Sequence, residues 1–230
     1  MKKRNFIKEI EGIKANLLER ESRIGQAFIR WFDVLACLAT LEDRSSDSEE
    51  FKVLKQAISH YAPICGVACL EGYFRLLVKD LIDYGPPFSV NAQEFSDVKF
   101  SILEINAIRD KRITVGEFIA HLLPMNNLSD INSHMTILLS EDLIKLVRCS
   151  VPTGRRVGNQ ILPETRTNEE LYPNMIKDLA KVFEVRHVLC HELATAYRLD
   201  IEDIGKMYSN VMSFINTVEY LISQRMRSSK

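Results

Sequence analysis

A single periodic stripe near the C-terminal end constrains the fold of this chain most strongly. Between residues 201 and 222, large apolar side chains recur every three or four positions, with polar residues between them. This spacing places them on one face of an α-helix, which has about 3.6 residues per turn. Asp200 precedes the stripe and is a typical helix N-cap. The chain therefore contains a long amphipathic helix, with a stripe formed by Ile201, Ile204, Tyr208, Val211, Ile215, Val218 and Ile222.

The first third of the chain shows the same periodicity. Residues 4–42 carry apolar positions in steps of three and four with one turn skipped, which predicts one long amphipathic helix. The serine-rich stretch 43–50 is predicted to be a loop. A second helix is predicted from about Glu50, with a break or kink at Pro63, because proline lacks an amide donor. Gly-Pro-Pro at 85–87 is expected to end that helix.

The middle of the chain has weaker signals. Thr114 and Glu117 form a capping-box pattern and predict a short helix after Thr114. Residues 142–148 are a further helix candidate. Residues 150–167 contain two glycines, two prolines and three arginines, which predicts an exposed basic loop. The basic tail at 225–230 is expected to fray.

Composition supports an all-α fold. The 230 residues are 46% hydrophobic and 27% charged, which is ordinary for a globular protein, and only 9 are glycine and 7 proline. With so few helix breakers, and with no convincing strand alternation, we expect one all-α domain over 1–230. It would consist of the 4–42 helix and a helical core at 50–225 with a mostly helical insert at 88–166.

Charge and cysteine usage limit the classes of function. The formal net charge is −1, so no global basic field would draw the chain to nucleic acid. The cysteine count is five and therefore odd, which indicates reduced thiols rather than a disulfide framework. The apolar run at 28–41 contains Arg30 and Asp33 and is short for a membrane span. We expect a soluble, cytoplasmic protein without a signal peptide.

One polar cluster interrupts an otherwise apolar helical pattern that follows Pro173. The sequence VRHVLCHE contains Arg186, His187, His191 and Glu192. The two histidines are four residues apart and share a face of a helix. Arg186 falls where the apolar stripe predicts a buried side chain, so its guanidinium needs a carboxylate, an anion or a water-filled cleft. An anion site beside an imidazole suits phosphate chemistry.

Several interpretations of this cluster remain open. Arg186 can pair with a carboxylate such as Glu71 or Glu184, and both histidines can be ordinary surface residues. The spacing His-x3-His is also that of two metal ligands on one helix, although the remaining ligands would have to come from elsewhere. On an ideal helix Arg186 and His191 lie about 140° apart. They converge only if Arg186 wraps around the helix, the helix is distorted, or a second subunit contributes.

The segment Arg186-x4-His191, with a polar residue after the arginine, resembles the R-x4–6-H signature of HEPN domains. In that family the motif lies on a long helix that a further amphipathic helix follows, as at 200–223 here. An earlier helix with a glutamate among apolar residues, as at Glu71, also resembles the family. Two positions depart from it: His187 stands where asparagine is usual, and Leu193 stands where some toxins of the family have tyrosine.

The resemblance implies a metal-independent endoribonuclease that uses no cofactor and attacks phosphorus with the RNA 2′-hydroxyl. His191 would be the general acid or base, Arg186 would neutralise the phosphorane, and His187 would orient Arg186 or bind phosphate. The family pairs two motifs across a homodimer and acts in bacterial stress response or phage defence, in some cases with an antitoxin or another regulatory protein. Glu71 would support Arg186. Further contacts with RNA are expected from Arg155, Arg156 and Glu192.

A second hypothesis comes from another functional class. The same scaffold can serve as a non-catalytic module that dimerises or binds a nucleotide or a partner protein. The near-neutral charge and the histidine at position 187 favour this alternative.

Overall fold

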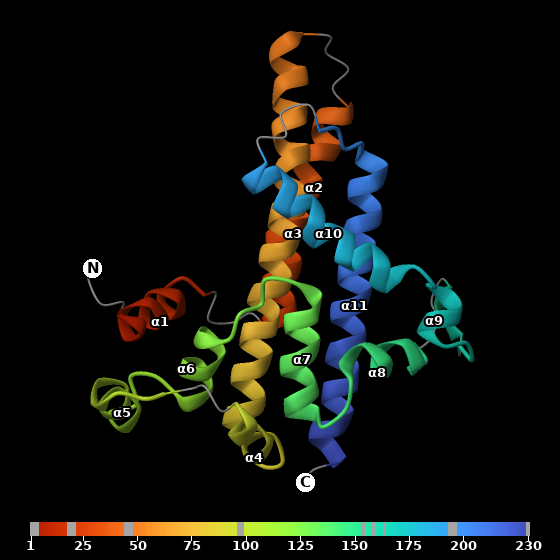
Figure 1. The fold of residues 1–230 in the computed structure, drawn as a ribbon. Coiled ribbons are helices and arrows are strands. Elements are labelled where there is room, and N and C mark those ends of the chain that lie inside the picture. Colours follow the sequence, from red (N-terminus) through yellow and green to blue (C-terminus); the bar gives the residue numbers. More distant parts are fainter. Residues whose placement is uncertain are drawn as a thin grey trace. The chain divides into compact units, whose positions relative to one another are not determined.

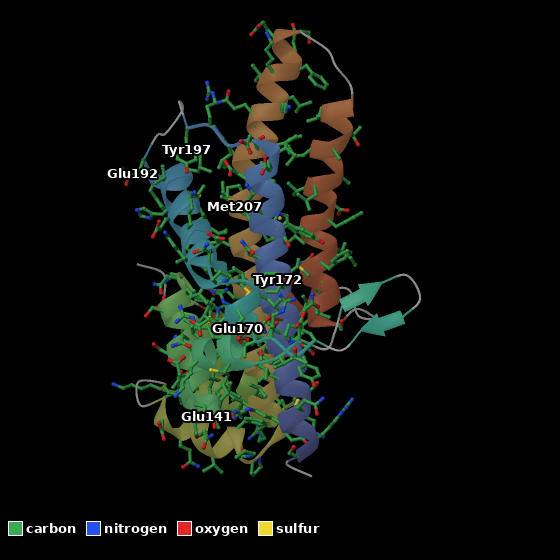
Figure 2. The ribbon with its side chains drawn as sticks, turned by 90° about the vertical axis from the view of Figure 1, so that its right-hand side faces the viewer. Glu141, Glu170, Tyr172, Glu192, Tyr197 and Met207 are labelled. Atoms are coloured by element: carbon green, nitrogen blue, oxygen red, sulfur yellow. The ribbon has the colours of Figure 1, made fainter. Side chains whose placement is uncertain are left out.

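The computed structural model describes residues 5–17, 22–43, 48–95, 99–152, 155–157, 160–162, 164–192 and 197–228. Figure 1 shows an all-α protein, as predicted, and two short paired strands, seen as arrows in Figure 2, are added to the helices. The chain divides into two compact units. Unit 1 comprises mainly residues 1–26 and 71–143, and unit 2 comprises mainly residues 27–70 and 144–228. The expectation of a single domain over 1–230 stays a prediction.

Unit 1 contains α1 and most of the short helices. The described helices with residues in unit 1 are α1 (Phe6–Ala15), the start of α2 (Arg23–Asp43), the second half of α3 (Glu49–Tyr84), α4 (Phe88–Asn91), the 3-10 turn η1 (Ala92–Glu94), α5 (Ile102–Arg109), α6 (Val115–Leu122) and α7 (Leu128–Leu139).

Unit 2 contains the longer helices and the strands. Its described elements are the rest of α2, the first half of α3, α8 (Leu143–Cys149), β1 (Arg155–Val157), β2 (Gln160–Leu162), α9 (Asn168–Leu171), α10 (Met175–His191) and α11 (Ile201–Ser228), with Leu143 itself assigned to unit 1.

The predicted single helix over 4–42 is two helices. Helix α1 ends at Ala15, where Asn16 is the C-cap and its backbone amide donates to the Ile13 carbonyl. Helix α2 begins at Arg23, and the Ser22 hydroxyl accepts a hydrogen bond from the Gly25 amide. The skipped turn in the apolar pattern therefore marks a break, which the capping groups Asn16 and Ser22 stabilise on either side.

The core of unit 1 forms where α1 packs on α6. Ile7 and Ile10 of α1 are buried together with Phe118 of α6, Ala107 and Ile113. The predicted capping box at Thr114 and Glu117 is confirmed: each side chain binds the backbone amide of the other residue.

The start of α6 is held on α3 by a side chain from outside the local sequence. Asp83 of α3 accepts hydrogen bonds from the Thr114 hydroxyl (2.6 Å) and from the Gly116 amide (3.0 Å). A Cβ atom at Gly116 would lie 2.5 Å from the Lys79 carbonyl oxygen. Glycine is therefore required at 116 for this close approach of the two helices.

His134 on α7 makes the stability of unit 1 dependent on pH. Burial lowers the pKa of His134 below its usual 6.5, and the hydrogen bond to the Pro124 carbonyl only partly opposes this. Since the unfolded chain then binds a proton more readily than the folded one, stability falls as the pH drops through 6.5 towards the folded-state pKa.

We expect His134→Gln to reduce this acid sensitivity. Urea unfolding at about pH 7.5 and about pH 5.5 would show a smaller loss of unfolding free energy in the variant than in the wild type. Equal losses in the two proteins would contradict the assignment to His134.

Unit 2 is a bundle in which Trp31 of α2 occupies the centre. The Trp31 side chain is fully buried and lies against Gly66 of α3. Its indole contacts the Tyr208 ring of α11 edge-on, with the ring centroids 5.4 Å apart. Helix α10 packs on α11, and the Asn210 amide donates to the Asp178 carboxylate at 3.0 Å. Trp31 is thus a core residue, whereas Phe28 on the same helix is 43% exposed.

Helix α3 passes through Pro63 without a break. It runs continuously from Glu49 to Tyr84, so the predicted break at Pro63 is wrong, while the predicted end before Gly85 is confirmed. An interior proline costs a helix about 3 kcal/mol. Ala62, Cys65 and Val67 beside the proline are almost completely buried, and this packing offsets the missing hydrogen bond.

Two further predictions need correction. Residues 150–167 are not a simple loop, because β1 and β2 pair antiparallel there, with Arg155 opposite Leu162 and Arg156 opposite Ile161. The C-terminal helix continues to Ser228, so the tail from Arg225 is helical over most of its predicted frayed length. The other predicted features agree: α8 covers the candidate at 142–148, and Asp200 accepts from the Asp203 amide at the start of α11.

Two helices are long and apolar enough to cross a membrane, judged by length and composition alone. They are α2 over residues 23–41 and the whole of α3, whose most apolar stretch is 61% buried. Buried core helices pass the same test, and α3 is such a helix. The cytoplasmic localisation stays a prediction.

Candidate functional site

The polar cluster lies on the last two turns of α10. The helix buries Met175, Leu179, Val182 and Phe183 on one face, as the sequence pattern predicted. The side chain that follows these at the same spacing is Arg186, which is half-buried. A guanidinium thus lies at the edge of the unit 2 core, where a charged group is costly without a partner.

The two histidines form a solvent-exposed pair. The ring centroids of His187 and His191 are 5.0 Å apart with their planes tilted by 45°, and both residues are exposed. Glu192, the C-cap of α10, places a carboxylate oxygen 3.7 Å from His187 Nε2. Solvent and a ligand can therefore reach both imidazoles, which lie between Arg186 and Glu192 in the sequence. Glu192 is labelled in Figure 2.

The electrostatics of a helix end act against an anion here. The C-terminal end of α10 carries a partial negative charge from its free carbonyl groups, and Glu192 adds a full one. A phosphate that binds at this end gains its attraction from Arg186 and from any protonated imidazole. The arginine is thus necessary to anion binding at this site, and a second basic surface would strengthen it.

His60 reaches the segment that follows the cluster, a contact that the sequence did not reveal. Its Nε2 lies 2.8 Å from the Tyr197 carbonyl oxygen, so the ring of α3 donates to the backbone just before α11. Tyr197 is labelled in Figure 2. Because the two residues are 137 positions apart, no local motif could have indicated this contact. It fixes the chain just after residues 193–196, which lie outside the described part and include Leu193.

The roles predicted at this cluster for Arg155, Arg156 and Glu71 stay predictions. Arg155 and Arg156 belong to β1, and their side chains lie outside the described part, so their contact with RNA stays a prediction. Glu71 is half-buried on the unit 1 half of α3, and its pairing with Arg186 stays a prediction as well.

Arg166, from the basic stretch, is already bound locally. It donates to the Glu164 carboxylate through Nε and Nη2, both at 3.1 Å, and these hydrogen bonds hold the pKa of Glu164 at about 2. This arginine is therefore neutralised by its own neighbour.

Among the residues that the structure describes, no group of three or more His, Cys, Asp and Glu side chains is arranged to hold a metal ion. In comparisons with protein-family models, with curated proteins and with solved structures, no match was found. The chemistry of the cluster itself is therefore what indicates a function.

Proposed function

We propose that this protein is a metal-independent endoribonuclease of the HEPN type. The observation that carries the proposal is the exposed pair of imidazoles beside a half-buried arginine at the end of α10. Imidazole is the side chain whose ordinary pKa allows it to accept and donate protons near neutral pH. Arginine presents a planar fork of donors that matches two phosphate oxygens.

The residues have distinct roles in this proposal. His191 transfers the proton of the 2′-hydroxyl or of the leaving 5′-oxygen, and Arg186 stabilises the charge that develops on the phosphorane. His187 binds a phosphate oxygen or orients Arg186. The products are an RNA end with a 2′,3′-cyclic phosphate and an end with a free 5′-hydroxyl.

The distance between the rings supports the use of two chains at each site. In-line displacement puts the attacking and leaving oxygens on opposite sides of phosphorus. With a hydrogen bond of about 3 Å on each side, the acid and the base stand more than about 6 Å apart even before the phosphorane is counted. The rings of His187 and His191 are centred only 5.0 Å apart. In this proposal the two rings of one chain therefore act at one end of the displacement, and the other copy of a homodimer completes the site.

Incubation of the purified chain with total RNA in EDTA tests the proposed reaction. The wild type is expected to cleave and to leave cyclic phosphate ends, and His191→Ala is expected to lower the rate by about 10²- to 10⁴-fold, the usual contribution of a general acid or base. Lys181→Ala, at an exposed position of the same helix, is the matched control and keeps full activity. Cleavage by His191→Ala at the wild-type rate would contradict the mechanism.

The alternative is a non-catalytic module that dimerises or binds a partner protein or nucleotide through the same scaffold. The charge at the end of α10 favours this alternative. The Glu192 carboxylate and the partial negative charge of the helix C-terminus both oppose the approach of a polyanion. A folded wild-type dimer that cleaves no RNA in the same assay would support this alternative.

A further inference from the structure

A pair of buried thiols lies between α2 and α3 in unit 2. Cys65 and Cys69 are one helical turn apart on α3 and are only 1% and 2% exposed. Because residues four apart on a helix share one face, the two thiols lie on the same side of α3. Arg30 of α2 completes the cluster: its backbone carbonyl oxygen accepts a hydrogen bond from the Cys65 thiol at 3.5 Å, and the positive charge of its guanidinium favours the Cys65 thiolate.

We propose that Cys65 and Cys69 form a binding site for one monovalent thiophilic metal ion of the Cu(I) class, with Arg30 as its charge-balancing neighbour. Thiolates select soft ions such as Cu(I) over Mg²⁺ or Ca²⁺. This inference does not rest on the proposed ribonuclease activity, because it concerns residues of α2 and α3, whereas the histidines lie on α10.

The helix geometry favours a bridging ion over a disulfide. Side chains four residues apart on a helix have Cβ atoms about 5–6 Å apart, whereas the Cβ atoms of a disulfide are about 3.5–4.5 Å apart. A direct bond between the two sulfurs would therefore distort α3. An ion between the sulfurs, with metal–sulfur bonds of about 2.3 Å, lets the sulfurs stand up to about 4.6 Å apart and leaves the helix intact.

Charge selects a monovalent ion over a divalent one. When the ion binds, both thiol protons leave to solvent and no electron is transferred. Two thiolates and one monovalent cation carry a net charge of −1, which the guanidinium of Arg30 cancels. A divalent cation in the same place would leave an excess positive charge beside a buried site, and such a charge is costly.

Arg30 also provides the path of entry. The thiols themselves are sealed from solvent, but the Arg30 residue that contacts Cys65 is exposed.

The test is an anaerobic titration of the full-length chain with Cu(I) against a colorimetric Cu(I) chelator. It starts from a background in which the three exposed cysteines, Cys37, Cys149 and Cys190, are replaced by serine. This background is expected to bind one Cu(I) per chain. In it, Cys65→Ser or Cys69→Ser is expected to weaken binding by about 100-fold or more, since even changes outside the ligand shell cost about 10- to 100-fold.

Arg30 variants test the role of charge. Arg30→Gln is expected to weaken Cu(I) binding by about 10-fold, and Arg30→Lys is expected to retain most of it. Circular dichroism of every variant establishes that the fold is kept. Binding that survives in a folded Cys65→Ser variant, or that disappears with the three exposed cysteines, would overturn the proposal. A Cys65–Cys69 disulfide that forms readily in the folded chain would overturn it too.

Discussion

Gly66→Ala is expected to destabilise the protein, although alanine is a better helix former than glycine. A Cβ atom at this position of α3 would lie 2.6 Å from Cη2 and 2.8 Å from Cζ2 of Trp31. The indole is fully buried and contacts Tyr208 on its other side, so it has no free space to move into. Overpacking of this kind costs about 1–3 kcal/mol or more, which outweighs the gain in helix propensity of about 1 kcal/mol.

Gly72→Ala is the matched control for this experiment. It is the same substitution six residues later on α3, and no atom of the described residues beyond its own stretch of helix lies within 4 Å of the added Cβ. We expect it to raise the unfolding free energy by up to about 1 kcal/mol. Urea unfolding followed by fluorescence measures both variants, because Trp31 is the single tryptophan of the chain. Equal stability changes at positions 66 and 72 would contradict the close contact.

A second substitution locates the cause. Trp31→Phe removes the benzo ring that the new methyl group would strike, together with the buried indole N–H, which has no hydrogen-bond partner within the described residues. The two substitutions together are therefore expected to cost less than the sum of their separate effects. Simple additivity would indicate that Gly66 acts through helix propensity alone.

Periodicity predicted the long helices, because the stripe from Ile201 to Ile222 depends only on local spacing. Breaks and turns were predicted less well. The 4–42 pattern continues in phase across the gap between α1 and α2, so the apolar residues alone did not reveal the break near Asn16. At Pro63 the opposite error occurred, because a break was predicted where the helix continues. The burial of the neighbouring side chains outweighs the cost of the hydrogen bond that proline lacks.

The candidate site could be predicted only where its residues are close in sequence. The pairing of His187 with His191 follows from a spacing of four on one helix, and the half-buried position of Arg186 follows from the phase of the stripe. The contact of His60 with Tyr197 depends on how α3 packs in unit 2, and no pattern within either segment encodes it. Arg30 and Cys65 meet across two helices for the same reason.

Mixing two inactive variants is expected to restore RNA cleavage. If Arg186 of one chain serves a site with His191 of the other, homodimers of Arg186→Ala and of His191→Ala each lack a group at both sites. We expect each to retain less than about 1% of wild-type activity. A mixed dimer has one site with both groups intact and one site that lacks both. Equal amounts of the two chains, refolded together, give mixed dimers as half of the population, which predicts recovery of about one quarter of wild-type activity.

The control for this recovery is a second mixture prepared in the same way. In it, the double variant Arg186→Ala/His191→Ala replaces the single Arg186→Ala variant, so no combination of chains yields a complete site and the mixture stays inactive. Analytical ultracentrifugation establishes that dimers form in both mixtures. If mixed dimers form and activity does not return, Arg186 and His191 act within one chain. In that case Arg186 must wrap around α10 to reach the exposed ring of His191, and the pair of rings 5.0 Å apart would have to bind a single phosphate without help from a partner.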